Sequence, residues 1–67
     1  MNEEALEELK RAADLVPNDA DIQFYLGRVY LELGNVREAR LCFENALRLN
    51  PDDREAARLL GRMPDER

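Results

Sequence analysis

Residues of similar type recur 34 positions apart along most of this 67-residue chain, and this spacing constrains the fold more than any other feature. Prolines, glycines, alanines and larger apolar residues all share the interval. The six pairs are Pro17 and Pro51, Gly27 and Gly61, Ala12 and Ala46, Ala5 and Ala39, Leu9 and Phe43, and Leu26 and Leu60. A period of this length is typical of stacked structural repeats, in which each unit buries its apolar face against the next.

Turn-forming residues divide the chain into four segments. Three pairs combine residues that stop a helix or begin a turn. They are Pro17 and Asn18, Gly34 and Asn35, and Asn50 and Pro51. The segments between them are rich in Ala, Leu, Glu and Arg, which favour helices. The pattern therefore predicts helices at residues 2–16, 20–33, 36–49 and 54–63, with no strand.

The predicted helix ends carry residues suited to those places. A polar residue followed three positions later by an acidic one favours capping of the last three helices. The predicted N-caps are Asn18, Asn35 and Asp52. Gly34 is expected in the left-handed conformation just after the second helix. Pro51 and Pro64 are expected to end the third and fourth helices.

Apolar residues follow one stripe at intervals of three and four in the first and third predicted helices. The stripes are Ala5, Leu6, Leu9, Ala12, Ala13 and Val16, and then Ala39, Phe43, Ala46, Leu47 and Asn50. The predicted core face of the second helix comprises Ile22, Leu26, Val29, Tyr30 and Leu33. This helix is apolar over more of its circumference, because Phe24, Tyr25 and Leu31 lie beyond that face. It therefore needs neighbours on more than one side, which favours a stack.

The residue types that are missing exclude most catalytic chemistry. The chain has no His, Ser, Thr or Trp, so it lacks a proton shuttle near neutral pH and the usual hydroxyl nucleophiles. The single cysteine, Cys42, allows no internal disulfide and is interpreted as a packing residue. The acidic run Glu3, Glu4, Glu7 and Glu8 is interpreted as a solvated helix start. We therefore predict no enzyme activity, no cofactor and no metal site.

Charge and hydropathy argue against binding to nucleic acid and against insertion into a membrane. Fifteen acidic and ten basic side chains leave a net charge of −5, which argues against nucleic acid. The longest uncharged stretch, residues 22–27, is far too short to span a membrane. No basic start followed by an apolar run occurs near Met1, so no secretory signal is predicted. We expect a cytoplasmic protein, or a piece of a larger one.

Residues 20–53 resemble a single tetratricopeptide repeat. The resemblance rests on Leu26, Gly27, Tyr30, Ala39, Phe43, Ala46 and Pro51, with Gln23 in place of the opening Trp of the family. Residues 1–17 resemble the second helix of a preceding repeat, and 54–67 the first helix of a following one, around a complete repeat at 18–53. The resemblance implies one all-α domain of antiparallel helical hairpins, stacked as a short right-handed solenoid. Small residues such as Gly27 are expected to let two helices approach closely.

The resemblance also implies a protein–protein interaction module, an adaptor or scaffold whose first helices present a concave wall to a peptide or partner helix. Carried onto this chain, the candidate binding residues are Phe24, Arg28, Leu31, Arg58 and Arg62, and the wall also includes Asp21, Glu32 and Glu55. An apolar floor flanked by arginines suits an acidic segment with one hydrophobic anchor. Alternatively, the arginines are ordinary solvated residues, and Phe24 and Leu31 are buried against a neighbouring helix or subunit. Phe24 and Arg28 stand where some members carry a Lys and Asn carboxylate clamp, so no clamp is expected.

Half repeats at both ends favour self-association, because stacked repeats usually need three or more units. Residues 1–17 carry a net charge of −3 and residues 54–63 a net charge of +2. We predict a homo-oligomer, either a dimer that exchanges helices about Gly34 and Asn35 or a head-to-tail stack. The last helix could instead fold back as a cap. The alternative to a binding module is a structural self-association piece, or a designed minimal repeat, without a ligand.

Overall fold

The computed structural model of the chain describes residues 2–63, and all regular structure in this range is helical. The helices are α1 (Asn2–Leu15), α2 (Ala20–Glu32), α3 (Val36–Leu49) and α4 (Arg54–Arg62). Each predicted boundary agrees with these bounds to within one residue. The predicted all-α fold of stacked antiparallel hairpins is confirmed.

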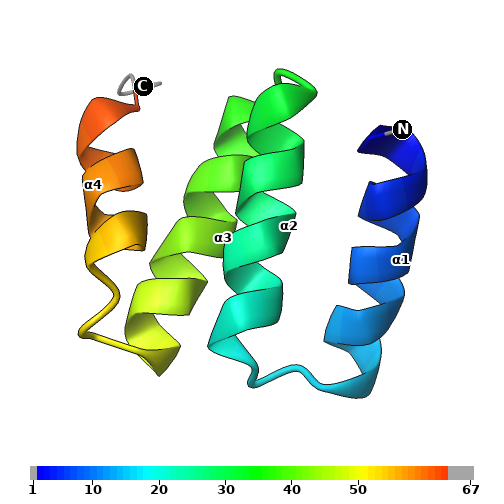
Figure 1. Cartoon of the computed structure of the whole chain (residues 1–67), viewed down its shortest axis with the longest axis horizontal. Helices are drawn as coiled ribbons and strands as arrows, with labels where there is room; N and C mark the ends of the chain where they lie inside the picture. The colour runs from blue at the N-terminus through cyan, green and yellow to red at the C-terminus, as the bar shows by residue number, and fades with distance from the viewer. Residues whose placement is uncertain (1, 64–67) are drawn as a thin grey trace.

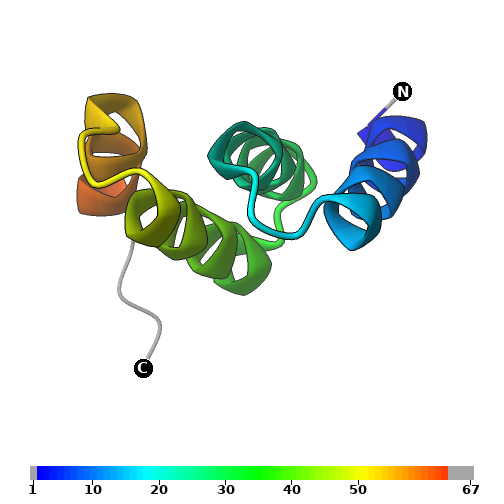
Figure 2. The same cartoon turned by 90° about the horizontal axis from the view of Figure 1, so that it is seen from below.

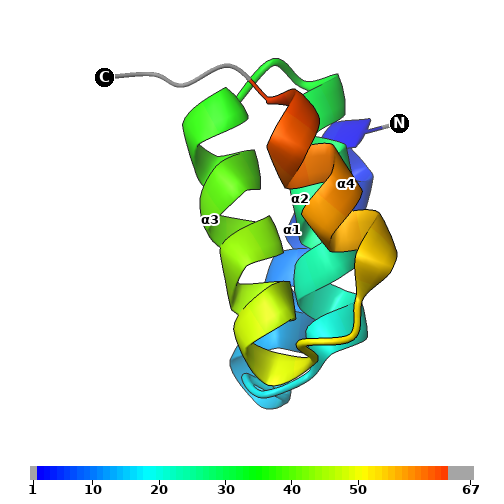
Figure 3. The same cartoon turned by 90° about the vertical axis from the view of Figure 1, so that its left-hand side faces the viewer.

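Consecutive helices lie side by side and alternate in direction (Figure 1). Seen along the helices, α2 and α4 lie on one side of the molecule, while α3 lies on the other side and between them (Figure 2). The view from the α4 end gives the same arrangement, with α3 set apart from α2 and α4 (Figure 3). The α2 and α4 helices run in the same direction and lie on the same side of the molecule (Figures 1 and 2).

The predicted ends of α2 and α3 are confirmed. Gly34 has a φ of +82°, and its N–H donates to the carbonyl oxygen of Leu31 at 3.1 Å. The N–H of Asn35 donates to the carbonyl oxygen of Tyr30 at 2.8 Å, which closes the turn typical of a glycine C-cap. The α3 helix ends at Leu49, two residues before Pro51. Pro64 lies outside the described residues.

The predicted N-caps of α2 and α4 are wrong by one residue. The cap of α2 is Asp19 instead of Asn18, and the cap of α4 is Asp53 instead of Asp52. Asp19 accepts hydrogen bonds from the backbone N–H groups of residues 21 and 22 at 2.9 and 3.2 Å. Asp53 accepts one from the N–H of Ala56 at 3.0 Å. A capping oxygen must reach the second and third amides of its helix, and the later acid of each pair does so.

Two further sequence predictions need adjustment. Asn35 is the N-cap residue of α3, as predicted, but its side chain makes no capping hydrogen bond. Val16 and Asn50, placed at the ends of the predicted apolar stripes, are both exposed. Both lie just past the last helical residue, where the chain turns away from the neighbouring helix. The helical period therefore no longer sets their direction.

The core lies mainly between α2 and α3. Phe43 is fully buried, as are Ala39 and Ala46 on its two sides along α3 and Ala56 on α4. A Cβ atom built at Gly27 would lie 2.7 Å from a ring carbon of Phe43, so a larger side chain would not fit. The predicted close approach of α2 and α3 at this glycine is therefore confirmed.

Candidate binding face

The exposed sides of α2 and α4 lie on the same side of the molecule (Figure 2), and we call the surface that they form the α2/α4 face. Its residues are Asp21, Tyr25, Arg28 and Glu32 on α2 and Glu55, Arg58 and Arg62 on α4, all of them exposed. On α2 these residues recur at intervals of three and four, opposite the side that packs on α3. Because the two helices run in the same direction, their N-terminal halves lie at one end of the face and their C-terminal halves at the other (Figure 1).

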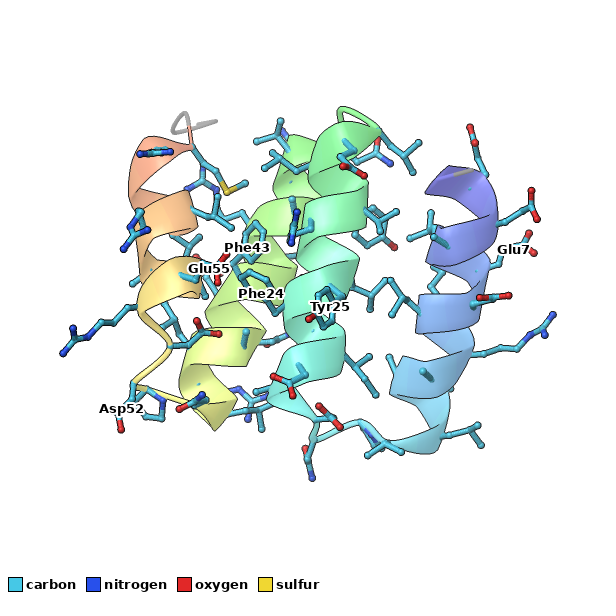
Figure 4. The ribbon with its side chains drawn as sticks, viewed as in Figure 1. Glu7, Phe24, Tyr25, Phe43, Asp52 and Glu55 are labelled. Atoms are coloured by element: carbon cyan, nitrogen blue, oxygen red, sulfur yellow. The ribbon has the colours of Figure 1, made fainter. Side chains whose placement is uncertain are left out.

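A hollow of about 410 Å³ opens at the end of this face where α2 and α4 begin. It is lined by Asp21, Phe24 and Tyr25, by Asn50, Asp52 and Asp53 of the α3–α4 connection, and by Arg54 and Glu55. Figure 4 shows Glu55 on the side of α4 that faces α2, with Asp52 at the connection below it. Four carboxylates and one guanidinium surround the hollow, so its charge is predominantly negative.

The two apolar residues predicted as a binding floor are largely core residues. Phe24 is only 8% exposed, and its ring centroid lies 5.7 Å from that of Phe43. Leu31 is half-buried and packs against the same cluster. Burial against a neighbouring helix, the alternative weighed for these residues, therefore accounts for most of their surface. Phe24 nevertheless reaches the hollow with part of its ring.

Tyr25 is the residue on this face that sequence reasoning left out of the site. Its side chain is 52% exposed, lines the hollow, and meets the ring of Phe24 edge-on at an interplanar angle of 77°. Figure 4 shows Tyr25 and Phe24 side by side on α2. The signal was present in the spacing, since Tyr25 lies four residues after Asp21 and three before Arg28, on the same helical strip.

The three predicted arginines are all exposed, but none of them lines the hollow. Arg28 follows Asp21 by seven residues, and Arg62 follows Glu55 by seven. Each pair therefore shares one side of its helix, with about 10 Å between its members along the axis. The α2/α4 face thus has an acidic end at the hollow, while its other end, two turns away, carries Arg28 and Arg62 together with Glu32. Asp21 and Glu55 in the first turns, and Arg62 in the last turn of α4, also stabilise the helices themselves.

Cys42 does not contribute to this face. It lies on the buried side of α3, and burial raises the pKa of its thiol to about 11, with a smaller contribution from the negative charge of Glu38. The thiol is therefore protonated and unreactive near neutral pH. Across residues 2–63 no three potential metal-binding side chains come together. In the same range no helix is long and apolar enough to cross a membrane.

Comparison with known protein families identifies the family to which the chain belongs. The tetratricopeptide-repeat family matches residues 1–63. The chain belongs to this family. Tetratricopeptide repeats generally mediate protein–protein interactions and are typically not enzymes. A comparison with curated proteins finds no match.

One departure from the tetratricopeptide pattern has a visible consequence. Gln23, which stands in place of the opening Trp, is half-buried, and its side-chain oxygen accepts a long hydrogen bond of 3.5 Å from the amide of Asn45. A polar contact between α2 and α3 thus replaces an apolar one at this end of the repeat. The division into a complete repeat at 18–53 and half repeats at 1–17 and 54–67 stays a prediction.

Proposed function

We propose that this chain is an adaptor-type protein-interaction module that holds an extended peptide or a partner helix against the α2/α4 face. The hollow of about 410 Å³ between α2 and α4 carries this proposal, because an exposed aromatic ring, Tyr25, stands at its wall. Aromatic side chains of this kind are frequent anchors in protein interfaces. Family membership supports the same general role. A cytoplasmic location stays a prediction from the sequence.

The charge along the face specifies the ligand. The acidic segment predicted from the sequence fits the end that carries Arg28 and Arg62, where a carboxylate can accept paired hydrogen bonds. The hollow, with its four carboxylates, favours a basic side chain instead. The two ends are about 10 Å apart, which a peptide in the polyproline II conformation covers in one turn of about three residues, so that residues three positions apart lie on the same side of it. The ligand that fits best therefore has a basic and an acidic residue three positions apart, with an apolar side chain over Tyr25.

Labelled peptides test this proposal. We expect a peptide with lysine and glutamate three residues apart, and leucine between them, to bind more tightly than all-acidic, all-basic or neutral peptides of equal length. Tyr25→Ala should weaken this binding about tenfold, the usual effect of removing an interface anchor. Leu41→Ala is the matched control, because Leu41 is similarly exposed, at 60%, but lies on α3 away from the face.

Charge reversal separates the two ends of the face. Glu55→Arg should remove the preference for the lysine of the peptide, and Arg28→Glu the preference for its glutamate. Equal effects of Tyr25→Ala and Leu41→Ala would contradict the proposed face. If every peptide bound equally weakly, the module would need a different kind of partner.

Self-association is a second candidate function, and the two end helices favour it. The apolar stripe of α1, which includes Ala5, Leu9 and Ala12, is only half-buried. The described helix α1 carries five acidic and two basic side chains, whereas α4 carries three arginines and one acid. Opposite charges on two incompletely covered helices suit contact between copies. Light scattering at several concentrations tests this function, and a folded monomer throughout would contradict it.

A further inference from the structure

The contact between α2 and α3 has a simple pattern of small and large residues. Gly27 leaves room on α2 for the ring of Phe43, since a Cβ atom at this position would lie 2.7 Å from a ring carbon. Ala39 and Ala46, one turn to either side of Phe43, are fully buried. The stripe of Ala39, Phe43 and Ala46 on α3 thus packs against Gly27 of α2, and this contact holds the two helices of the hairpin together.

Equivalent residues recur 34 positions away in α1 and α4, for which the described residues contain no matching helix. Gly61 of α4 corresponds to Gly27, but apart from its own turn of helix no described residue comes within 4 Å of its Cβ position. The counterparts of the α3 stripe in α1 are Ala5, Leu9 and Ala12, and these are only half-buried. Within the described residues, no Ala–Phe–Ala type stripe packs on the glycine of α4. Likewise, no glycine lies opposite the apolar stripe of α1.

The α1 and α4 helices carry net charges of opposite sign, which favours contact between them. Helix α1 has a net charge of −3, and helix α4 has a net charge of +2. Two copies of α1, or two copies of α4, repel each other, whereas α1 and α4 from different copies attract. The electrostatics thus favour contact between unlike ends of the chain.

We propose that copies of this chain associate head to tail, with α4 of one copy packed on α1 of the next in the register of the α2–α3 pair. Leu9 of the second copy then lies over Gly61, as Phe43 lies over Gly27. The α4 helix of one copy and the α1 helix of the next then form a hairpin like that of α2 and α3. This inference rests on the proposed self-association and specifies its surfaces, its direction and its register.

Helix exchange, the other predicted route to a dimer, would have to break contacts that are already made. The connection at Gly34 is closed by two backbone hydrogen bonds of 3.1 and 2.8 Å. Ala56 of α4 is fully buried within its own chain. Head-to-tail contact keeps both features and uses only the surfaces left uncovered. Because such a contact is not self-complementary, the assembly should grow beyond two copies as the concentration rises.

Substitutions at the two surfaces test the contact by analytical ultracentrifugation. Gly61→Leu fills the space above α4 and should raise the dissociation constant about tenfold or more. The variant chain should still fold, because leucine has a higher helix propensity than glycine. Leu9→Ala should weaken association as well. Leu15→Ala is its matched control on α1, since Leu15 lies outside the stripe and its loss should change little.

Cross-linking tests the register. Gln23 and Asn45 are in contact across the α2–α3 pair, and their counterparts 34 positions away are Ala57 and Arg11. In a Cys42→Ala background, a chain with Arg11→Cys mixed with a chain with Ala57→Cys should give a covalent pair with a short thiol cross-linker. Leu15→Cys mixed with Ala57→Cys should give none. A single chain with both Arg11→Cys and Ala57→Cys should give a ladder of products.

Three results would overturn the inference. Assemblies that stop at two copies would exclude head-to-tail growth. Association that resists Gly61→Leu and gives no Arg11→Cys to Ala57→Cys product would exclude this register while leaving the proposed self-association intact. A monomer at every concentration would exclude both.

Discussion

The central hairpin and the end helices contain equivalent residues in different surroundings. Phe43 is fully buried between α2 and α3, whereas its counterpart Leu9 on α1 is half-buried. Gly27 is closely contacted, whereas apart from its own turn of helix no described residue comes near the Cβ position of Gly61. The comparison shows that a repeat sequence sets the shape of each surface, while the neighbouring helix sets how much of that surface is buried.

The largest expected effect tests burial directly. Phe43→Ala should lower the free energy of unfolding by about 3–5 kcal/mol, because it empties the centre of the core. Leu9→Ala should cost much less in dilute solution, where α1 is half solvated. Urea unfolding monitored by circular dichroism measures both. Equal losses would mean that α1 is as well packed as α3.

Gly27 and Gly61 are equivalent glycines that differ in how closely other side chains approach them. Gly27→Leu should destabilise the chain by about 1–3 kcal/mol, because the new side chain overlaps the ring of Phe43. Gly61→Leu should instead stabilise the dilute monomer by up to about 1 kcal/mol through helix propensity. Thermal unfolding at low concentration measures the difference. A loss of stability in both variants would show that α4 is more crowded than described.

Cys42 in α3 and Glu8 in α1 lie 34 positions apart and occupy equivalent places in the repeat. The thiol of Cys42 is buried, whereas the carboxylate of Glu8 is exposed. The pKa of Cys42 is raised from its ordinary value of 9.0 to about 11, so the thiol ionises more readily in the unfolded chain. Stability should therefore be unaffected below pH 9 and fall by about 2 kcal/mol as the pH rises to 11.

Substitution isolates this pH effect from the titration of tyrosine and lysine. Cys42→Ala should remove the part of the alkaline loss that the thiol causes, and Glu8→Ala should leave it unchanged. Urea unfolding at intervals between pH 8 and 11 supplies the measurement. Identical pH profiles for the parent chain and Cys42→Ala would contradict the assigned cause.

The smallest expected change in stability concerns the N-cap residues of α4 and α3. Asp53→Ala should cost about 1 kcal/mol, because it removes the oxygen that caps α4. Asn35→Ala should cost less, since the Asn35 side chain makes no capping bond. Helix content followed during thermal unfolding distinguishes the two. Equal costs would indicate that Asn35 caps α3 in solution.

Much of the fold was predictable from residue order. The 34-residue spacing and the turn residues located all four helices to within one residue. The caps were harder, because Asn18 and Asp19, like Asp52 and Asp53, are adjacent and chemically able to cap. Only the local path of the backbone decides which oxygen reaches the amides of the first turn.

The candidate site was less predictable. The resemblance to the tetratricopeptide repeat placed Arg28 and Glu55 on the predicted wall, and both are exposed in the structure. Helical spacing could not decide whether Phe24 or Tyr25 would be the accessible aromatic residue, since both lay beyond the predicted core face. The answer depends on where α3 and α4 lie relative to α2, because their side chains cover Phe24 and leave Tyr25 half exposed.

By itself the sequence determined the helices, their ends at Gly34 and Pro51, and the recurrence that marks the family. These features depend on backbone sterics and on residues a few positions apart. The tertiary structure decided which apolar side chains are buried, where the acidic hollow lies, and which surfaces of α1 and α4 remain uncovered. Burial and charge at a surface depend on the helix lying across from it, and that helix is distant in the sequence.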